Sequence, residues 1–166
     1  NDNSSDELDL GYWNGNVVAN HGIVFNGGGG IWTGDVLSNN GRVLSGRAAQ
    51  HSVATDNSQW HGDVVGNVGS IDSYAFWYGE VKGNSGIVAN SGWWEGDVQA
   101  GNTGTIYNAQ DNFGVPVYDT IRPTWQGVVV GNAGTILNIG ADWTGDVSAN
   151  TGQISNRAGV YNGFLL

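Results

Sequence analysis

A tryptophan followed by a glycine two residues later and a valine four residues later recurs along this chain, and this repeat constrains the fold most. Each unit continues through an asparagine, a glycine and a β-branched residue to a final asparagine or serine. Most units are 17–19 residues long, and seven copies agree, which compositional chance does not produce. Such repeats predict a solenoid, in which stacked units share one core. The tryptophans are Trp13, Trp32, Trp60, Trp77, Trp94, Trp125 and Trp143.

Apolar and polar residues alternate within each unit, which is the periodicity of a β-strand and not of a helix. Glycine numbers 29 in 166 residues, too frequent for stable helices. We therefore predict an all-β, single-stranded parallel β-helix, a right-handed β-solenoid of seven coils plus a partial eighth. Tryptophan, glycine and valine should share one face of a strand, with the glycine leaving room for the indole. Tryptophan, valine, isoleucine and asparagine should each stack as ladders about 4.8 Å apart.

The chain divides into an acidic N-terminal segment, residues 1–9, which we expect to be flexible, and a β-solenoid over residues 10–166. Two long steps between tryptophans indicate insertions at residues 46–59 and 109–124. Both should leave the solenoid from the same corner, three coils apart. Their roots would then lie about 14 Å apart, so the insertions should protrude side by side.

The formal net charge of −10 argues against nucleic acid as a partner, because nucleic-acid binding relies on basic patches. No apolar run approaches the length of a membrane helix, so we expect no membrane insertion. There is no cysteine, so neither a disulfide framework nor a thiolate metal site is expected. Cations, glycans and other proteins are the partners that fit this composition.

The repeat resembles the passenger domains of autotransporter adhesins of Gram-negative bacteria, which carry tandem runs of the form W-x-G-x-V-x-N-x-G-x-I-x-N. The resemblance covers about residues 11–165 outside the insertions. It implies a right-handed β-helix at the cell surface that serves adhesion or self-association, with no reaction. The matching segments include Trp32-Thr33-Gly34-Asp35-Val36, Asn84-Ser85-Gly86-Ile87-Val88-Ala89-Asn90 and Trp143-Thr144-Gly145-Asp146-Val147.

An acidic column occupies the third position after most tryptophans and should point outward. Like charges stacked about 5 Å apart repel, so a cation such as Ca²⁺ could bridge them through oxygen ligands. The alternative is a solvated face that opposes lateral aggregation. The candidate metal ligands are Asp35, Asp63, Glu80 and Asp97, with Asp146 in the same column. No other cofactor is expected.

The insertions and one extra tryptophan are the candidate ligand or partner surface, because loops on a rigid scaffold often carry binding. Trp93 directly precedes Trp94 and must therefore face the opposite way, near Phe76 and Tyr74. Burial beneath a loop is the alternative for Trp93, and simple decoration is the alternative for the insertions. The insertion candidates are Arg47, His51, Asp56, Phe113, Tyr118, Asp119 and Arg122.

Open solenoid ends expose strand edges, which can pair with another molecule. The chain stops within an eighth unit, so it is either part of a longer array or a subunit whose half coil the next molecule completes. In the second case Leu10 and Tyr12 would meet the residues at the other end. The candidate polymerisation residues are Leu10, Tyr12, Tyr161, Phe164, Leu165 and Leu166.

Three functions follow from these patterns. We expect a non-enzymatic, extracellular, structural or adhesive segment; the alternatives are a head-to-tail filament subunit and a glycan-binding or polysaccharide-degrading module that uses the two loops. Catalysis has little support, because Lys82 is the only lysine and no carboxylate pair at a defined separation is evident. His51, Ser52 and Asp56 are neighbours in sequence, but adjacent residues rarely form a catalytic triad.

Overall fold

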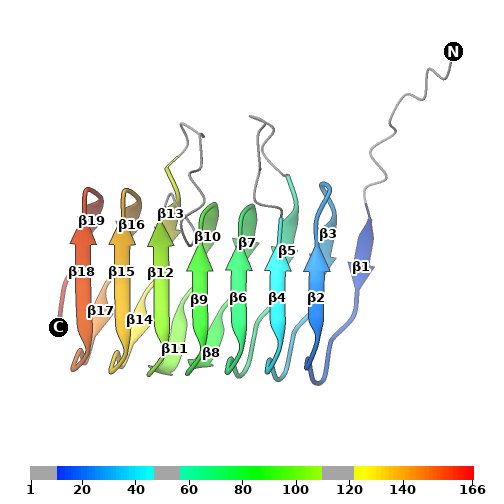
Figure 1. The fold of residues 1–166 in the computed structure, drawn as a ribbon, viewed down its shortest axis with the longest axis horizontal. Helices are drawn as coiled ribbons and strands as arrows, with labels where there is room; N and C mark the ends of the chain where they lie inside the picture. Colours follow the sequence, from blue (N-terminus) through cyan, green and yellow to red (C-terminus); the bar gives the residue numbers. More distant parts are fainter. Residues whose placement is uncertain (1–10, 47–56, 110–121) are drawn as a thin grey trace, which may run out of the picture.

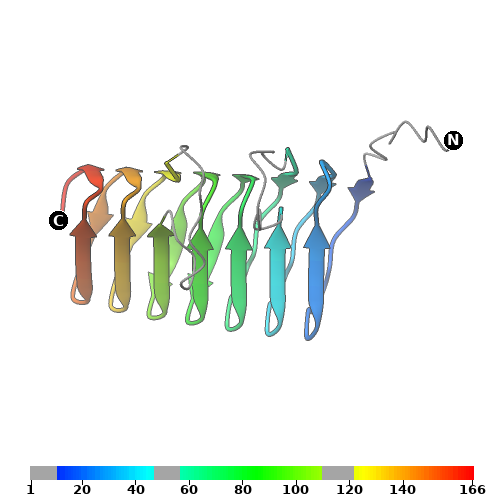
Figure 2. The same ribbon diagram turned by 45° about the horizontal axis from the view of Figure 1, so that its top comes forward.

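The structure, a computed structural model, describes residues 11–46, 57–109 and 122–166, which form a parallel β-solenoid with no helix (Figures 1 and 2). All strand pairings among these residues are parallel, and each strand pairs with its equivalents in the neighbouring coils. The coils therefore stack into an elongated rod whose two described ends lie far apart (Figure 1). The predicted fold class is confirmed, while right-handed winding stays a prediction.

The first of three sheets carries the repeated tryptophans and is called here the tryptophan sheet. It has eight strands, and their register sets each tryptophan directly beside the next, as in Trp13↔Trp32 and Trp60↔Trp77. Its strands are β1 (Tyr12–Asn14), β3 (Ile31–Thr33), β5 (Gln59–His61), β7 (Phe76–Tyr78), β10 (Trp93–Glu95), β13 (Thr124–Gln126), β16 (Asp142–Thr144) and β19 (Val160–Asn162).

The second sheet, called the valine sheet, has four short strands and begins at the repeated valine. Isolated bridges such as Val17↔Val36 and Val147↔Leu165 extend the same ladder toward both ends. Its strands are β8 (Val81–Asn84), β11 (Val98–Asn102), β14 (Val129–Val130) and β17 (Val147–Ser148).

The third sheet, called the isoleucine sheet, has seven strands and forms the front of the view in Figure 1. It carries the β-branched residue of each repeat, with Ile71, Ile106 and Ile136 at most 1% exposed. Its strands are β2 (Ile23–Asn26), β4 (Arg42–Ser45), β6 (Ser70–Ser73), β9 (Ile87–Asn90), β12 (Thr105–Ala109), β15 (Thr135–Ile139) and β18 (Gln153–Arg157).

The tryptophans stack as a continuous ladder through the interior, as predicted. Successive indole centroids lie 4.7–5.0 Å apart, and from Trp32 to Trp143 the ring planes are within 5° of parallel. The five indoles from Trp60 to Trp143 are fully buried, whereas Trp13 in the first coil is 51% exposed. Each aromatic contact adds about 0.5–1.5 kcal/mol to the apolar burial, so this ladder is a main source of stability.

Two asparagine ladders satisfy the buried amides, also as predicted. In the first, each Nδ2 donates to the Oδ1 of the next coil at 2.7 Å, through Asn20, Asn39, Asn67, Asn84, Asn102, Asn132 and Asn150. The second runs from Asn90 through Asn108 and Asn138 to Asn156. Ser45 and Ser73 occupy the equivalent positions nearer the N-terminus and interrupt that ladder.

Two details of the predicted repeat are wrong. The strand that carries each tryptophan ends one residue later, and the chain bends at the glycine, so tryptophan and valine lie in different sheets. Because the chain turns at the corner between these two sheets, the tryptophan and the valine both still point into the interior. The glycine does not make room for the indole: a Cβ on Gly79 would lie 2.0 Å from the carbonyl oxygen of Gly62 in the preceding coil. Close stacking of backbones, not indole volume, excludes larger residues there.

The described residues that border the two insertions lie at one corner, between the isoleucine and tryptophan sheets. One border follows β4 and the other follows β12, and β6 and β9 lie between these strands in the sheet. The predicted separation of three coils between the insertion roots is therefore confirmed. The N-terminal segment, most of the two insertions and their predicted protrusion side by side lie outside the described residues.

Candidate functional site

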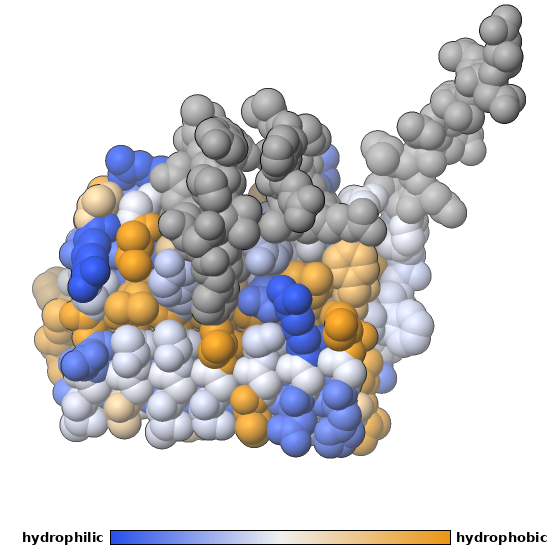
Figure 3. All heavy atoms as spheres, viewed as in Figure 1, coloured by the Kyte–Doolittle hydropathy of each residue, from blue (hydrophilic) through white to orange (hydrophobic). Residues whose placement is uncertain are grey.

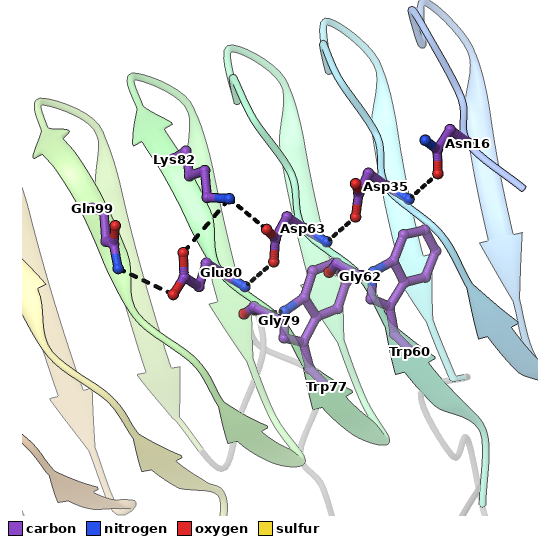
Figure 4. Close-up of polar contacts among 10 residues, drawn as sticks. All are labelled: Asn16, Asp35, Trp60, Gly62, Asp63, Trp77, Gly79, Glu80, Lys82 and Gln99. Atoms are coloured by element: carbon purple, nitrogen blue, oxygen red, sulfur yellow. Dashed lines mark hydrogen bonds and ion pairs between the residues drawn. The ribbon is translucent and has the colours of Figure 1, made fainter.

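The acidic column lies at the bend between the tryptophan and valine sheets, directly after the repeated glycine (Figure 4). The backbone N–H of Asp63 donates to Oδ1 of Asp35 at 2.9 Å, and the N–H of Glu80 donates to Oδ1 of Asp63 at 2.9 Å. Asn16 accepts the N–H of Asp35 in the same way. These acceptors link one coil to the next, a structural role that the predicted outward-pointing column did not include.

The column continues toward the C-terminus with one variation, at Glu80. Glu80 has a longer side chain and accepts a hydrogen bond from Nε2 of Gln99 at 3.1 Å instead. Asp97 accepts the backbone N–H of Val128 at 2.7 Å, and Asp146 accepts that of Phe164 at 2.8 Å. The carboxylates of this column therefore join neighbouring coils over most of the rod.

A lysine ammonium already lies between two of the stacked carboxylates (Figure 4). Nζ of Lys82 is 2.6 Å from Oδ2 of Asp63 and 3.8 Å from Oε2 of Glu80. The hydrogen bond to Asp63 raises the pKa of Lys82. Burial raises the pKa of Asp63, but the bonds from Lys82 and the Glu80 amide outweigh it, so that pKa is lowered. The repulsion expected within the column is thus relieved at this point by the protein's own cation.

The Ca²⁺ prediction remains a prediction. Within the residues that the structure describes, no group of three or more histidine, cysteine, aspartate or glutamate side chains is arranged to hold a metal ion. The four proposed ligands form a single file instead, and Asp35, Asp63 and Asp97 each use one oxygen to accept a backbone N–H.

Aromatic side chains gather on the outer face of the tryptophan sheet, where the sequence pointed to Trp93. As predicted, Trp93 faces away from buried Trp94; it is half-buried and pairs in register with Phe76. In the next outward row, His61 stacks on Tyr78 with ring centroids 4.8 Å apart. Ladder stacking turns these two ring faces toward each other and not toward solvent. One face of each ring is therefore covered and not open to a sugar ring.

His61 and Tyr78 were not among the aromatic residues predicted for this surface. Aligning the residues directly before and after each tryptophan would have found them, because Phe76, Trp93, His61 and Tyr78 occupy these columns in neighbouring coils. The Oε1 of Gln59 lies 3.1 Å from Nε2 of His61, at the edge of the cluster.

Of the proposed loop residues, only Arg122 is described. Its guanidinium lies 3.4 Å from Oδ1 of Asp142 in an exposed ion pair, a contact worth little at a protein surface. Arg47, His51, Asp56, Phe113, Tyr118 and Asp119 lie outside the described residues, as does Leu10.

The two ends of the described solenoid expose apolar side chains, which is consistent with the predicted end residues. Tyr12 is 73% exposed at one end, and Phe164 and Leu166 are 70% and 71% exposed at the other. Tyr161 continues the tryptophan ladder at 6.2 Å from Trp143, and burial raises its pKa. The C-terminal end is stepped, because the isoleucine sheet ends one coil before the tryptophan sheet.

Head-to-tail assembly stays a prediction.

The front of the isoleucine sheet carries no uniform surface. In the described part of this face, polar and apolar patches alternate (Figure 3). Arg42 and Asp72 form an ion pair at 2.7 Å here, and the bond to Asp72 raises the pKa of Arg42. Ile23 and Phe25 are 70% and 42% exposed at one end of the sheet.

Comparison with known proteins found no family model that matches the sequence, and no match among curated proteins or solved structures. The resemblance to autotransporter passenger repeats therefore remains a prediction. Among the described residues there is also no helix long and apolar enough to cross a membrane.

Proposed function

We propose that this chain is a non-enzymatic structural segment of an extracellular surface protein, and that it serves adhesion or self-association. The proposal rests on one observation: the inward-facing residues are the same in successive coils, whereas the outward-facing residues differ. Tryptophan, valine, asparagine and glycine recur at the inward and corner positions of successive coils. The outward position after each tryptophan differs in most coils: Asn14, Thr33, His61, Tyr78, Glu95, Gln126 and Thr144. Such a rod can change its surface without changing its fold.

The charge of the chain supports contact with neutral glycans or proteins. The net charge is −10, and the described ion pairs engage three of the five basic residues: Arg42, Lys82 and Arg122. A surface of this sign is repelled by anionic membranes and nucleic acids. Loops that leave a rigid scaffold are common binding elements, which makes the insertion corner the first region to test.

The test removes both insertions while keeping the coil spacing. Gly46 is joined to Asn57, and Ala109 to Arg122. Four residues then separate the last residue of each repeat, Ser45 or Asn108, from the next tryptophan, and the other coils have three to five residues there. Binding of labelled protein to bacterial cells, epithelial cells and a glycan array is measured for the parent and the double deletion. We expect the parent to adhere and the deletion to lose adhesion while keeping its circular dichroism and cooperative unfolding.

A matched control replaces the two segments with glycine-serine linkers of the same lengths, which separates loop chemistry from loop length. If the deletion binds as well as the parent, the rod surface and not the insertions is adhesive. If the parent neither adheres nor self-associates, the proposed function is wrong. Release of reducing sugar from polysaccharides by the parent would instead support the enzymatic alternative.

A further inference from the structure

The geometry points to a further activity: the tryptophan ladder conducts positive charge, so that after an external one-electron oxidant takes an electron from one indole, the electron vacancy passes from coil to coil toward Trp13. Seven indoles lie in direct contact, with centroids 4.7–5.0 Å apart and nearly parallel planes. Indole is among the most readily oxidised side chains, and stacked π systems exchange electrons quickly. An electron vacancy on one ring is therefore filled by its neighbour, and the vacancy moves along the rod.

The hydrogen bonds of the indoles keep the charge mobile in the interior. Each buried Nε1–H donates to a backbone carbonyl, as from Trp60 to Gly62 at 3.0 Å and from Trp94 to Gly96 at 2.9 Å. A carbonyl oxygen strengthens its bond to an oxidised indole but does not accept the proton. The buried radical cation thus cannot become a neutral radical, and no coil in the middle of the ladder traps the charge.

The acidic column favours positive charge along the same path. Asp63 directly follows Gly62, whose carbonyl accepts the Trp60 indole, and Glu80 follows Gly79, which accepts the Trp77 indole at 3.0 Å (Figure 4). A row of carboxylates therefore runs beside the row of indoles. Lys82 pairs with Asp63 and Glu80, and the column as a whole keeps a net negative charge. Burying an unpaired charge is costly, and nearby opposite charges reduce that cost.

The charge comes to rest at Trp13. This indole is 51% exposed, and its Nε1–H donates to the carbonyl oxygen of Gly15 at 2.9 Å. Unlike the equivalent bonds of the buried indoles, this bond is exposed, so water can reach the N–H and accept the proton. There the radical cation loses its proton to water. The neutral radical then combines with a proton and with superoxide, which forms when the oxidant passes its electron to dissolved dioxygen, to give a hydroperoxide. Tyr161 at the opposite end does not compete, because its hydroxyl is buried with no hydrogen-bond partner to take a proton.

The test uses the absence of cysteine from the chain. Thr144→Cys, at an exposed position beside Trp143, gives one thiol for a ruthenium polypyridyl photosensitiser. In the flash–quench method, methyl viologen accepts an electron from excited Ru(II), and dissolved dioxygen reoxidises the reduced viologen, which gives superoxide. The resulting Ru(III) takes one electron from the nearest indole and returns to Ru(II). Six coil spacings separate this site from Trp13, about 29 Å, too far for a single transfer step to compete. Peptide mass spectrometry then locates the oxygenated tryptophans.

Trp94→Phe breaks the ladder, since phenylalanine can stack but is much harder to oxidise. Trp93→Phe is the matched control, because Trp93 is adjacent in sequence but lies outside the ladder. We expect Trp93→Phe to leave the yield of oxidised Trp13 unchanged and Trp94→Phe to lower it at least tenfold. Trp125→Phe is a second break in the ladder if Trp94→Phe does not fold. Equal Trp13 yields in all folded variants, or no Trp13 product in any, would overturn the proposal.

A mixture of the ruthenium-labelled protein with an unlabelled, ¹⁵N-enriched copy shows whether charge passes between molecules. The proposal requires oxidised Trp13 to carry natural-abundance nitrogen. Neither adhesion nor the insertions enter this experiment, so its outcome is independent of the proposed function.

Discussion

The carbonyl oxygen of Gly79 accepts the indole N–H of Trp77 at 3.0 Å, and the same oxygen lies 2.0 Å from the place that a Cβ on Gly96 of the next coil would occupy. The peptide that anchors each tryptophan therefore excludes a side chain from the glycine stacked on it. The two repeated residues are linked through this one atom, coil after coil.

Gly96→Ala should destabilise the rod by about 3 kcal/mol, because two backbones must separate to admit the methyl group. Gly66→Ala is the matched control: a Cβ there meets no atom within 4 Å, so the free energy of unfolding should change by less than about 1 kcal/mol. Urea unfolding followed by tryptophan fluorescence measures both. Equal effects of the two substitutions would contradict this explanation of the repeated glycine.

Asn67→Ala should cost about 3 kcal/mol, because Asn67 accepts from Asn39 and donates to Asn84, each at 2.7 Å. The substitution leaves buried amide groups unpaired and opens a small cavity. Asn40→Ala, at an exposed neighbouring position, should have little effect. Thermal unfolding of the two variants at equal protein concentration gives the comparison, and similar melting temperatures would count against the ladder as a source of stability.

Ser45→Ala should stabilise the protein by about 1 kcal/mol. The Ser45 hydroxyl is buried without a hydrogen-bond partner, and an unsatisfied buried polar group is unfavourable. In the same column the Ser73 hydroxyl donates to the carbonyl oxygen of Ala75 at 3.4 Å, so Ser73→Ala should give no gain. Differential scanning calorimetry compares the two variants, and stabilisation by both or by neither would refute the prediction.

Asp63 should contribute stability that disappears in acid. Its pKa in the folded protein is below the ordinary value of 3.8, so its contribution is fully present above pH 3.8 and is lost as the pH falls through the lower folded-state pKa. The unfolding free energies of the parent and Asp63→Asn should therefore differ most near pH 7 and converge below pH 3.8. Urea titrations at pH 7, 5, 4 and 3 measure this difference.

Lys82→Gln provides the control for Asp63, because it removes the ammonium that lowers the carboxylate pKa. In that background the pH-dependent part of the Asp63→Asn effect should shrink. An unchanged pH profile would mean that the ion pair does not lower the pKa of Asp63.

The ladders were predictable from the sequence because tryptophan, valine and asparagine recur at fixed offsets, and parallel stacking turns equal offsets into contacts. The bend at Gly79 was not predictable from alternation, since a strand and a strand–corner–strand path both place Trp77 and Val81 inside. The pairing of Lys82 with Asp63 was also hidden, because it joins residues of different coils that share no pattern. Single contacts between variable positions require coordinates, whereas contacts between repeated positions do not.

The amide bonds from Asn20 to Asn150 all run the same way, each Nδ2 pointing toward the C-terminal end. The rod therefore has a direction. Along this line Asn20 presents an acceptor oxygen at one end, and Asn150 presents the donor Nδ2 at the other. A copy that extended this line in the same direction would set a donor against an acceptor, whereas a copy turned end for end would set like against like.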